Sequence, residues 1–317
     1  MTIQERISLK ELTTLKIGGT ARYFCVVSAV GELKEALSFA KEKHLPFFVL
    51  GDGSNLLIAE GEINTVVIKN EIKGIEWRNE GESVLVTAGA GESWDALVAE
   101  AVARGLWGIE NLSGIPGTVG AAPVQNIGAY GAELADILDS VEVVLVSPRG
   151  GASLARLRLA ECQFGYRDSI FKRPEGKHLI ITRVALRLKK NGAPNLVYKD
   201  LRRHFEGTKH APTLAEIRRA VLAIRARKFP DLARFGTAGS FFKNPIISPT
   251  HFDELKKRFP ELPGFPVDAD KRGYKETRIN ADNSLRIKDE GLRIKLSLAW
   301  ILDNICGLKG FQKGNVA

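Results

Sequence analysis

The sequence is poor in the residues that cross-link small domains or bind metals. It holds three isolated cysteines in 317 residues, Cys25, Cys162 and Cys306, and no CxxC pair. An odd number of isolated cysteines argues against a disulfide framework or a zinc site, and we expect a reducing, cytoplasmic compartment. The five histidines form no pair at metal-ligand spacing, so we expect no metal.

Long apolar runs are also missing. No run approaches the roughly 20 residues that span a bilayer, and the first ten residues, MTIQERISLK, lack the apolar core of a signal peptide. We therefore expect neither secretion nor a membrane partner. The composition itself is that of a globular chain, with 44% hydrophobic and 26% charged residues.

Positive charge is in excess, and the net charge is +9. Solvated helix faces account for most of it, and the remainder fits an anionic partner, either nucleic acid or a phosphorylated small molecule. Aromatic residues are not interleaved with the basic ones as in a nucleic-acid groove, so we expect no nucleic acid. The basic clusters are short and separate: 202–204, 225–228, 256–258 and 271–272.

Periodicity predicts helices and strands over most of the first 228 residues, beginning with a β–α–β pattern. An apolar stripe indicates a helix over 29–44, and a second helix is expected over 94–104. A third is expected over 213–228, where Thr213 and Glu216 form a capping box. Apolar or alternating runs predict strands over 45–50, 65–69, 83–88, 141–146 and 179–188.

The most unusual segment runs from Ser113 to Gly131, reading SGIPGTVGAAPVQNIGAYG. Its nineteen residues include five glycines and two prolines, and none is charged. Small side chains let the backbone approach a partner closely, and glycine permits positive φ where amides converge. Such a backbone can line a large, flat, anionic cofactor. A buried loop that only packs remains the alternative.

A second glycine-rich turn, Gly51 to Asn55 (GDGSN), follows an apolar strand directly. Free backbone N–H groups after a strand can form a nest that binds phosphate. The turn is neither a dinucleotide fingerprint, because Leu56 replaces the third glycine, nor a P-loop, because GK[ST] is absent. An ordinary tight turn stays the alternative.

The last third of the chain is less regular. Pro230 marks a predicted domain boundary, and small residues again surround polar ones over 236–245. Residues 264–293 are polar, charged and without clear periodicity, so we expect an exposed insertion or long loop. An apolar helix is predicted over 296–306.

Taken together, these segments resemble one enzyme family, the UDP-N-acetylenolpyruvoylglucosamine reductases. The resemblance covers nearly the whole chain, and the motifs come in the family's order. Together they are highly specific, although no one of them would be. The matching motifs are TLKIGGTARYF from Thr14, LGDGSNLL from Leu50, the Ser113 segment, CQFGYRDSIFK from Cys162, VYKDL from Val197, RKFPD from Arg227, GTAGSFFKNP from Gly236 and GLKGFQ from Gly307.

The resemblance implies an α+β fold and a flavoprotein of peptidoglycan synthesis. FAD would lie in a two-part domain of the vanillyl-alcohol-oxidase type, residues 1–70 and 71–229. Residues 230–317 would form an α/β substrate-binding domain, incomplete here. NADPH would reduce FAD, which would reduce the enolpyruvyl ether of UDP-N-acetylglucosamine to UDP-N-acetylmuramate. We expect a monomer whose partners are this UDP-sugar and NADPH.

Two catalytic residues follow from the resemblance. Negative charge builds beside the substrate carboxylate during reduction, and it needs a fixed cation and a proton source. Arg167 matches the family's active-site arginine, and Ser240 matches its proton donor. The alternatives are structural: Arg167 could pair with Asp168 or another acid, and Ser240 could cap a turn.

The resemblance also implies binding residues. Substrate would contact Tyr166, Tyr198, Lys228, Asn244 and Gln312, although Tyr198 could instead be a packing residue. FAD would contact both glycine-rich segments, through Gly51, Gly53, Ser54, Asn55, Leu56, Ile115, Pro116, Gly117, Gly120, Ala121, Ile127 and Gly128.

One departure from the family pattern limits these expectations. The sequence ends at Ala317, before the position of a family glutamate that assists protonation, so no residue is assigned that role. We therefore expect lowered turnover and a less stable third domain. A flavin-binding protein with little or no reductase activity is the alternative function, and a flavin-free nucleic-acid binder is a third.

Overall fold

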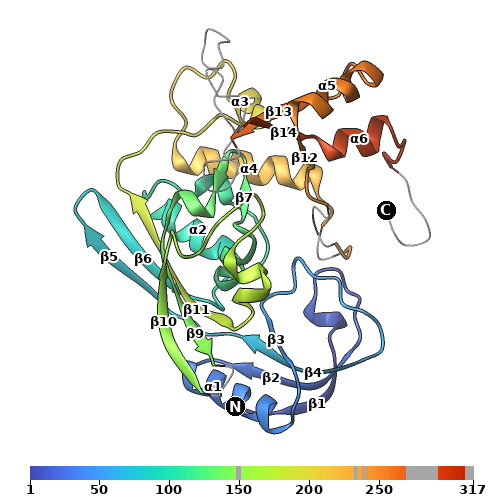
Figure 1. Ribbon diagram of the computed structural model, residues 1–317. Coiled ribbons are helices and arrows are strands. Elements are labelled where there is room, and N and C mark those ends of the chain that lie inside the picture. Colours follow the sequence, from blue (N-terminus) through green and yellow to red (C-terminus); the bar gives the residue numbers. More distant parts are fainter. Residues whose placement is uncertain (148–150, 232–233, 238, 240–241, 269–291, 311–317) are drawn as a thin grey trace. The chain divides into compact units, whose positions relative to one another are not determined.

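The computed structural model describes residues 1–147, 151–231, 234–237, 239, 242–268 and 292–310. Its contacts divide the chain into two compact units, residues 1–239 and 240–317. The finer divisions expected at 70/71 and 229/230 stay predictions. Mixed helices and strands confirm the α+β class (Figure 1). Among the described residues, no helix is long and apolar enough to cross a bilayer.

The first sheet of the larger unit combines an antiparallel edge with parallel strands. Helix α1 (Val30–Glu42) packs on it through the predicted apolar stripe, whose buried members include Leu33 and Leu37. Strand β4 is central and reads as a buried β-branched run, as expected for a parallel strand. The strand order is β1 (Gln4–Ser8), β2 (Thr20–Val27), β4 (Glu62–Asn70), β3 (Phe47–Leu50).

The second sheet is antiparallel, and its inner face forms the largest core of the protein together with helix α2 (Trp94–Ala103). Ser93 caps α2 as expected, because its side chain accepts a hydrogen bond from the Ala96 N–H. Asn70 links the sheets by donating to the Ile181 carbonyl, 2.9 Å away. The strand order is β10 (Ala152–Arg158), β9 (Leu138–Val146), β11 (Leu179–Lys189), β6 (Ser83–Gly89), β5 (Ile75–Glu80).

Two helices follow this sheet, α3 (Lys199–His204) and α4 (Leu214–Lys228). The predicted capping box at Thr213 and Glu216 is confirmed, with both reciprocal hydrogen bonds formed. A two-stranded ribbon, β7 (Gly128–Ala129) and β8 (Ala132–Glu133), lies at the end of the Ser113 segment. Strands β1, β5 and β10 were not predicted.

The smaller unit corrects one prediction. Residues 264–293 are not all loop, because β13 (Gly264–Asp268) and the first residues of β14 (Leu292–Leu296) pair within a three-stranded sheet, order β12 (Ile246–Ile247), β14, β13. Pro266 concealed β13, since proline is tolerated on an edge strand but weakens the strand pattern. Residues 269–291 lie outside the described part.

The C-terminal helix is also shorter than predicted. It is α6 (Leu298–Asn304), which begins after Ser297 caps the Trp300 N–H. Leu296 belongs to the strand before it, so the apolar run expected as one helix spans a strand end and a helix. Helix α5 (Pro249–Arg258) completes the described part of this unit.

Candidate active site

The two glycine-rich segments, about 60 residues apart in sequence, meet in the structure. Ser54 Oγ donates a hydrogen bond to the Pro116 carbonyl at 3.1 Å, and Asn55 Nδ2 donates to Gln125 Oε1 at 2.8 Å. A Cβ added at Gly117 would lie 2.8 Å from Ser54 Oγ. Gly117 also has φ +119°, so a side chain there would be strained in its backbone as well as close to Ser54. We call Gly51–Leu56 the first loop and Ser113–Gly131 the second loop.

Gly53 is constrained from another side as well. Its φ is +60°, and an added Cβ would lie 2.3 Å from the Leu12 carbonyl oxygen. The Thr14 N–H donates to the Gly53 carbonyl at 3.3 Å. A phosphate nest would need Gly53 only to stay open, whereas in the structure Gly53 also lets the first loop pack on residues 12–14.

Backbone donors of both loops lack protein partners. Within the described part of the chain, the N–H groups of residues 52–56, Gly117 and Thr118 have no hydrogen-bond acceptor. Two facing, glycine-rich loops with several unbonded N–H groups suit the oxygens of a diphosphate. These residues therefore fit FAD, whose diphosphate they would hold.

The second loop is fixed to the segment before α2. Trp94 N–H donates to the Gly117 carbonyl at 3.0 Å, and Gly120 N–H donates to the Ala90 carbonyl at 2.8 Å. A Cβ at Gly120 would lie 2.5 Å from Ala90 Cβ. Ala90 leaves no room for a side chain at this position, so packing by itself requires this glycine, and its contact with FAD stays a prediction.

Asp95 anchors the start of the second loop. It accepts a hydrogen bond from the Gly114 N–H at 2.6 Å, and Arg218 of α4 holds both of its carboxylate oxygens, at 2.6 and 2.8 Å. Partial burial raises the pKa of Asp95, but the hydrogen bonds from Arg218 and Gly114 outweigh it and hold the pKa below the ordinary value. The second loop, α2 and α4 are thereby joined through one carboxylate.

This network predicts a pH-dependent loss of stability. The pKa of Asp95 is lower in the folded protein than in the unfolded chain, where it is near 3.8. The ionised carboxylate therefore stabilises the fold at pH values above 3.8, and this stabilisation is lost as the pH falls through the pKa of the folded state. We expect Asp95→Asn to lower the free energy of unfolding by about 1–2 kcal/mol at pH 7, after allowance for partial exposure. Urea unfolding of the variant and the parent at pH 7 and at a pH well below 3.8 checks this. A stability difference that does not narrow at the lower pH contradicts it.

Arg167 lies on a tight turn that the second loop holds in place. Gly165 and Asp168 form the turn, with reciprocal backbone hydrogen bonds of 2.9 and 3.2 Å. Arg167 has φ +54°, an uncommon left-handed conformation of the kind that clusters at functional sites. Its Nη2 donates to the Gly128 carbonyl at 2.5 Å. The arginine is therefore brought to the second loop, as the catalytic assignment needs.

The structural alternative for Arg167 is not what the structure shows. Asp168 instead pairs with Arg173, whose Nη2 and Nε lie 2.9 and 3.1 Å from one carboxylate oxygen. The Arg167 guanidinium also lies 5.9 Å from the centre of the Tyr166 ring. Arg167 thus keeps its charge available for a ligand, with the backbone carbonyl of Gly128 orienting it.

Asn126 is a residue that the sequence argument missed. It is buried with φ +45°, and its Nδ2 donates to Glu133 Oε2 and to the Gly165 carbonyl, at 2.9 and 3.2 Å. Its Oδ1 accepts from the Ala135 N–H at 3.0 Å. One side chain therefore joins the second loop to the Arg167 turn. Asparagine tolerates left-handed backbone, and that was the available signal.

Tyr198 and Lys228 come together although 30 residues separate them. Lys228 Nζ lies 5.6 Å from the Tyr198 ring centre and forms an ion pair with Asp200. Tyr198 also packs edge-on against Tyr130 of the second loop, with ring centres 5.2 Å apart. Partial burial lowers the pKa of Lys228, but Asp200 and Tyr198 outweigh it and raise the pKa. The lysine is therefore charged beside a half-exposed aromatic ring.

The remaining predicted residues are distributed more widely. Three apolar members of the proposed FAD set, Leu56, Ile115 and Ile127, pack against hydrophobic cores. Asn244 belongs to the smaller unit, where its Oδ1 accepts from the Leu298 N–H at 3.0 Å. Ser240 and Gln312 lie outside the described residues. Within those residues, no group of three His, Cys, Asp or Glu side chains could hold a metal ion.

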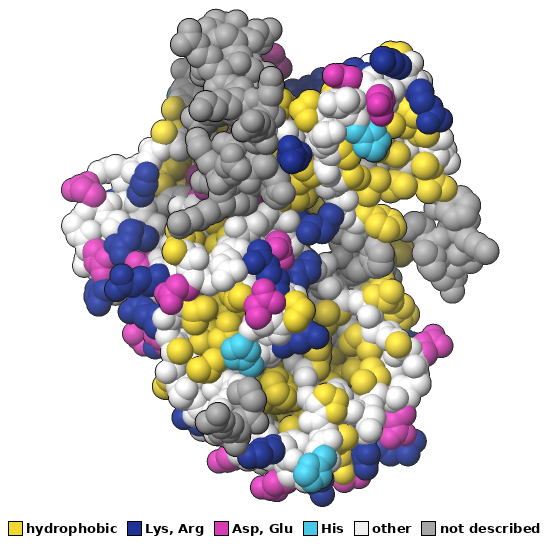
Figure 2. Space-filling model, in the orientation of Figure 1, with side chains coloured by type: hydrophobic (Ala, Val, Ile, Leu, Met, Phe, Trp, Pro, Cys, Tyr) yellow, Lys and Arg dark blue, Asp and Glu magenta, His cyan; other side chains and the backbone are white. Residues whose placement is uncertain are grey.

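Charge on the surface is mixed rather than gathered into a groove. Among the side chains coloured in Figure 2, Lys and Arg stand among Asp and Glu over the visible face. Several arginines are paired, including Arg187 with Glu80 and Asp139. The net positive charge does not by itself produce a nucleic-acid track on this face.

Comparison with known proteins defines the class. A family model described as an FAD binding domain matches residues 21–151, a range that includes the first loop and the whole of the second. The fold and the site thus define an FAD-binding oxidoreductase domain. Nearly full-length relatives define the family more closely.

The relatives are UDP-N-acetylenolpyruvoylglucosamine reductases. That of Pseudomonas aeruginosa is 40% identical over 100% of this chain and 86% of its own length. That of Cupriavidus pinatubonensis is 41% identical over 97% of this chain and 83% of its own. The crystal structure of UDP-N-acetylenolpyruvylglucosamine reductase (MurB) from Thermus caldophilus superposes with a TM-score of 0.53, at 26% identity over 98% of this chain and 96% of that chain. This chain belongs to the UDP-N-acetylenolpyruvoylglucosamine reductase family.

Proposed function

We propose that this chain uses NADPH to reduce the enolpyruvyl ether of UDP-N-acetylglucosamine to UDP-N-acetylmuramate, with FAD held between the first and second loops. The observation that carries the proposal is the meeting of these loops, with their unbonded N–H groups, beside the Arg167 turn. Bound FAD supplies the path for an electron pair from NADPH to the substrate. All described residues of this arrangement lie in the unit of residues 1–239.

Arg167 has the catalytic role that the geometry supports. Reduction of the enol ether places negative charge on the carbon next to the substrate carboxylate. A guanidinium holds a carboxylate bidentately and stabilises that charge as it grows. The hydrogen bond to the Gly128 carbonyl fixes Arg167 in advance, so that little reorganisation is needed.

Tyr198 and Lys228 are proposed to bind the nucleoside diphosphate of the substrate. A charged ammonium beside an aromatic ring suits a nucleoside diphosphate, with the phosphates on Lys228 and an apolar surface on Tyr198. Tyr166, Asn244 and Gln312 complete the proposed substrate set. We also propose that the protein is a monomer, and the free cysteines support a reducing cytoplasm.

Ser240 is proposed as the proton donor on the resemblance alone. We expect Ser240→Ala to leave FAD binding intact and to slow reoxidation of the reduced flavin by the enolpyruvyl substrate by about 10²–10⁴-fold. Stopped-flow absorbance of the pre-reduced enzyme measures this rate. An equal rate in the variant and the parent would remove Ser240 from the role.

The function is tested by two measurements on the purified chain. Flavin absorbance after reconstitution with FAD reports cofactor binding, and NADPH oxidation with and without the enolpyruvyl ether reports turnover. We expect both a flavin spectrum and substrate-dependent oxidation. A colourless protein that does not take up FAD contradicts the proposal. Flavin binding without substrate-dependent oxidation would instead favour a flavin-binding protein that lacks reductase activity.

A further inference from the structure

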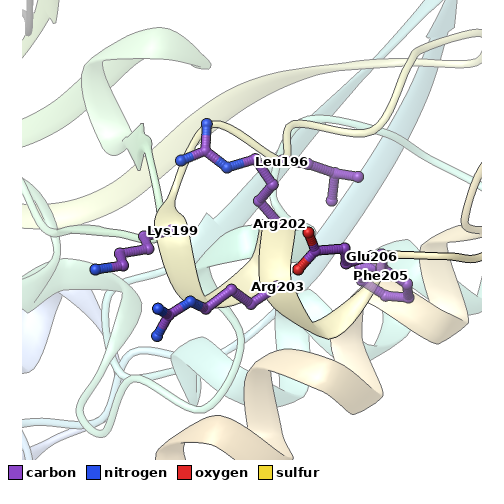
Figure 3. A pocket seen from close by; sticks show the side chains of 6 residues that line it. All are labelled: Leu196, Lys199, Arg202, Arg203, Phe205 and Glu206. Carbon is purple, nitrogen blue, oxygen red and sulfur yellow. The ribbon is translucent and has the colours of Figure 1, made fainter.

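Two surface hollows lie where α3 and the end of α4 come together. One has a volume of about 410 Å³ and is drawn in Figure 3; its lining is Leu196, Lys199, Arg202, Arg203, Phe205 and Glu206. The other has a volume of about 440 Å³ and is lined by Asp200, Arg203, His204, Ile224, Arg227 and Lys228. Arg203 lines both, so the two hollows adjoin at this residue.

The hollows are rich in unneutralised positive charge. In the described part of the chain, salt bridges to Lys199, Arg202, Arg203 and Arg227 are absent, and only Lys228 is paired, with Asp200. Arg202 and Arg203 follow Lys199 by three and four residues on α3, so each of them neighbours Lys199 on the helix surface. Figure 3 shows their side chains extending from the helix, with Glu206 as the one carboxylate in view. Such a surface favours an anion.

The hollows continue directly from the substrate-binding pair. Lys228 contributes to the second hollow and also lies over the Tyr198 ring, and Tyr198 is the residue immediately before α3. A nucleotide with its diphosphate on Lys228 would thus place its outer part near Arg203. Leu196 and Phe205 give the first hollow an apolar wall suited to a sugar or base.

We propose that these hollows bind the phosphomonoester on the adenosine ribose of NADPH, with Arg203 as its central ligand. The inference rests on the proposed function. Of the two nucleotide substrates, NADPH alone carries a phosphomonoester. The other anionic group outside a diphosphate is the enolpyruvyl carboxylate of the UDP-sugar, which the proposed function places on Arg167. A phosphomonoester is close to a dianion at pH 7 and presents three acceptor oxygens, which guanidinium groups bind bidentately. The cluster would therefore make the enzyme select NADPH over NADH.

The test measures binding before turnover. Titration calorimetry of the FAD-loaded protein compares adenosine 2′,5′-bisphosphate with adenosine 5′-monophosphate. We expect the parent to prefer the bisphosphate by at least about tenfold, which is the scale of one charge-assisted hydrogen-bond pair. Arg203→Gln should remove most of that preference. Arg203→Lys keeps the positive charge but cannot donate two parallel hydrogen bonds, so it should remove part of the preference. Arg219→Gln, an exposed charge on α4 outside the hollows, should leave it unchanged.

Steady-state kinetics and the affinity for UDP distinguish a phosphomonoester site from a diphosphate site. Arg203→Gln should raise the KM for NADPH about tenfold or more, while the KM for NADH stays within twofold. Equal affinity of the parent for the two adenosine nucleotides would overturn the proposal. So would an equal loss of UDP affinity in Arg203→Gln, because the ligand would then be the diphosphate. Bisphosphate preference in a protein that never oxidises NADPH would contradict the proposed function while supporting the anion site.

Discussion

Gly53→Ala is expected to weaken FAD binding by at least about tenfold and to lower the melting temperature. A left-handed conformation costs a residue with a Cβ about 1–2 kcal/mol. In addition, the new Cβ would lie 2.3 Å from the Leu12 carbonyl oxygen, so the first loop must move away from residues 12–14. That movement displaces the unbonded N–H groups that would hold the diphosphate. Fluorescence titration of the apoprotein with FAD measures the affinity.

Gly81 provides a matched control. Its φ is +61°, against +60° at Gly53, and an added Cβ would meet nothing within 4 Å. Gly81→Ala therefore carries the conformational cost without the collision, and it lies in the β5–β6 turn. We expect a small loss of stability and unchanged FAD affinity. If the two variants bind FAD equally well, the close approach to Leu12 has no bearing on the cofactor site.

Arg167→Asn is expected to lower kcat by about 10²–10³-fold with FAD still bound. This is the usual effect of removing one group that stabilises charge in the transition state. Asparagine suits the left-handed backbone at this position, so the turn is preserved while the charge is lost. Steady-state kinetics with a flavin spectrum of the same sample measures both properties.

Substitution of Arg173 tests whether turnover depends on the stability of the Gly165–Asp168 turn rather than on the charge of Arg167. Arg173→Gln breaks the pair with Asp168 and should lower the melting temperature while keeping most of the turnover. Arg167→Lys retains a charge without the planar fork, and we expect an intermediate kcat. A loss of turnover in Arg173→Gln as large as that in Arg167→Asn would mean that Arg167 acts only through the stability of the turn.

Several elements could be predicted because their signals are local. The helix α4 has both a capping box and a termination at Phe229–Pro230, and helix α1 has a continuous apolar stripe. The β-branched run in β4 could be predicted for the same reason. Strand β13 could not, because five residues that include Pro266 form a strand only through pairing with β14. Its stability comes from a partner that lies more than twenty residues away.

The sequence by itself determined the family, the two loops and the arginine, since motif order and glycine placement are properties of the chain alone. Only the tertiary structure decided which groups meet: Ser54 with Pro116, Asn126 with the Arg167 turn, and Arg173 rather than Arg167 with Asp168. The physical reason is that residue type sets what a backbone can adopt, whereas partners are chosen by packing between distant segments. Asn126 shows the difference, because its conformation is foreseeable and its three hydrogen bonds are not.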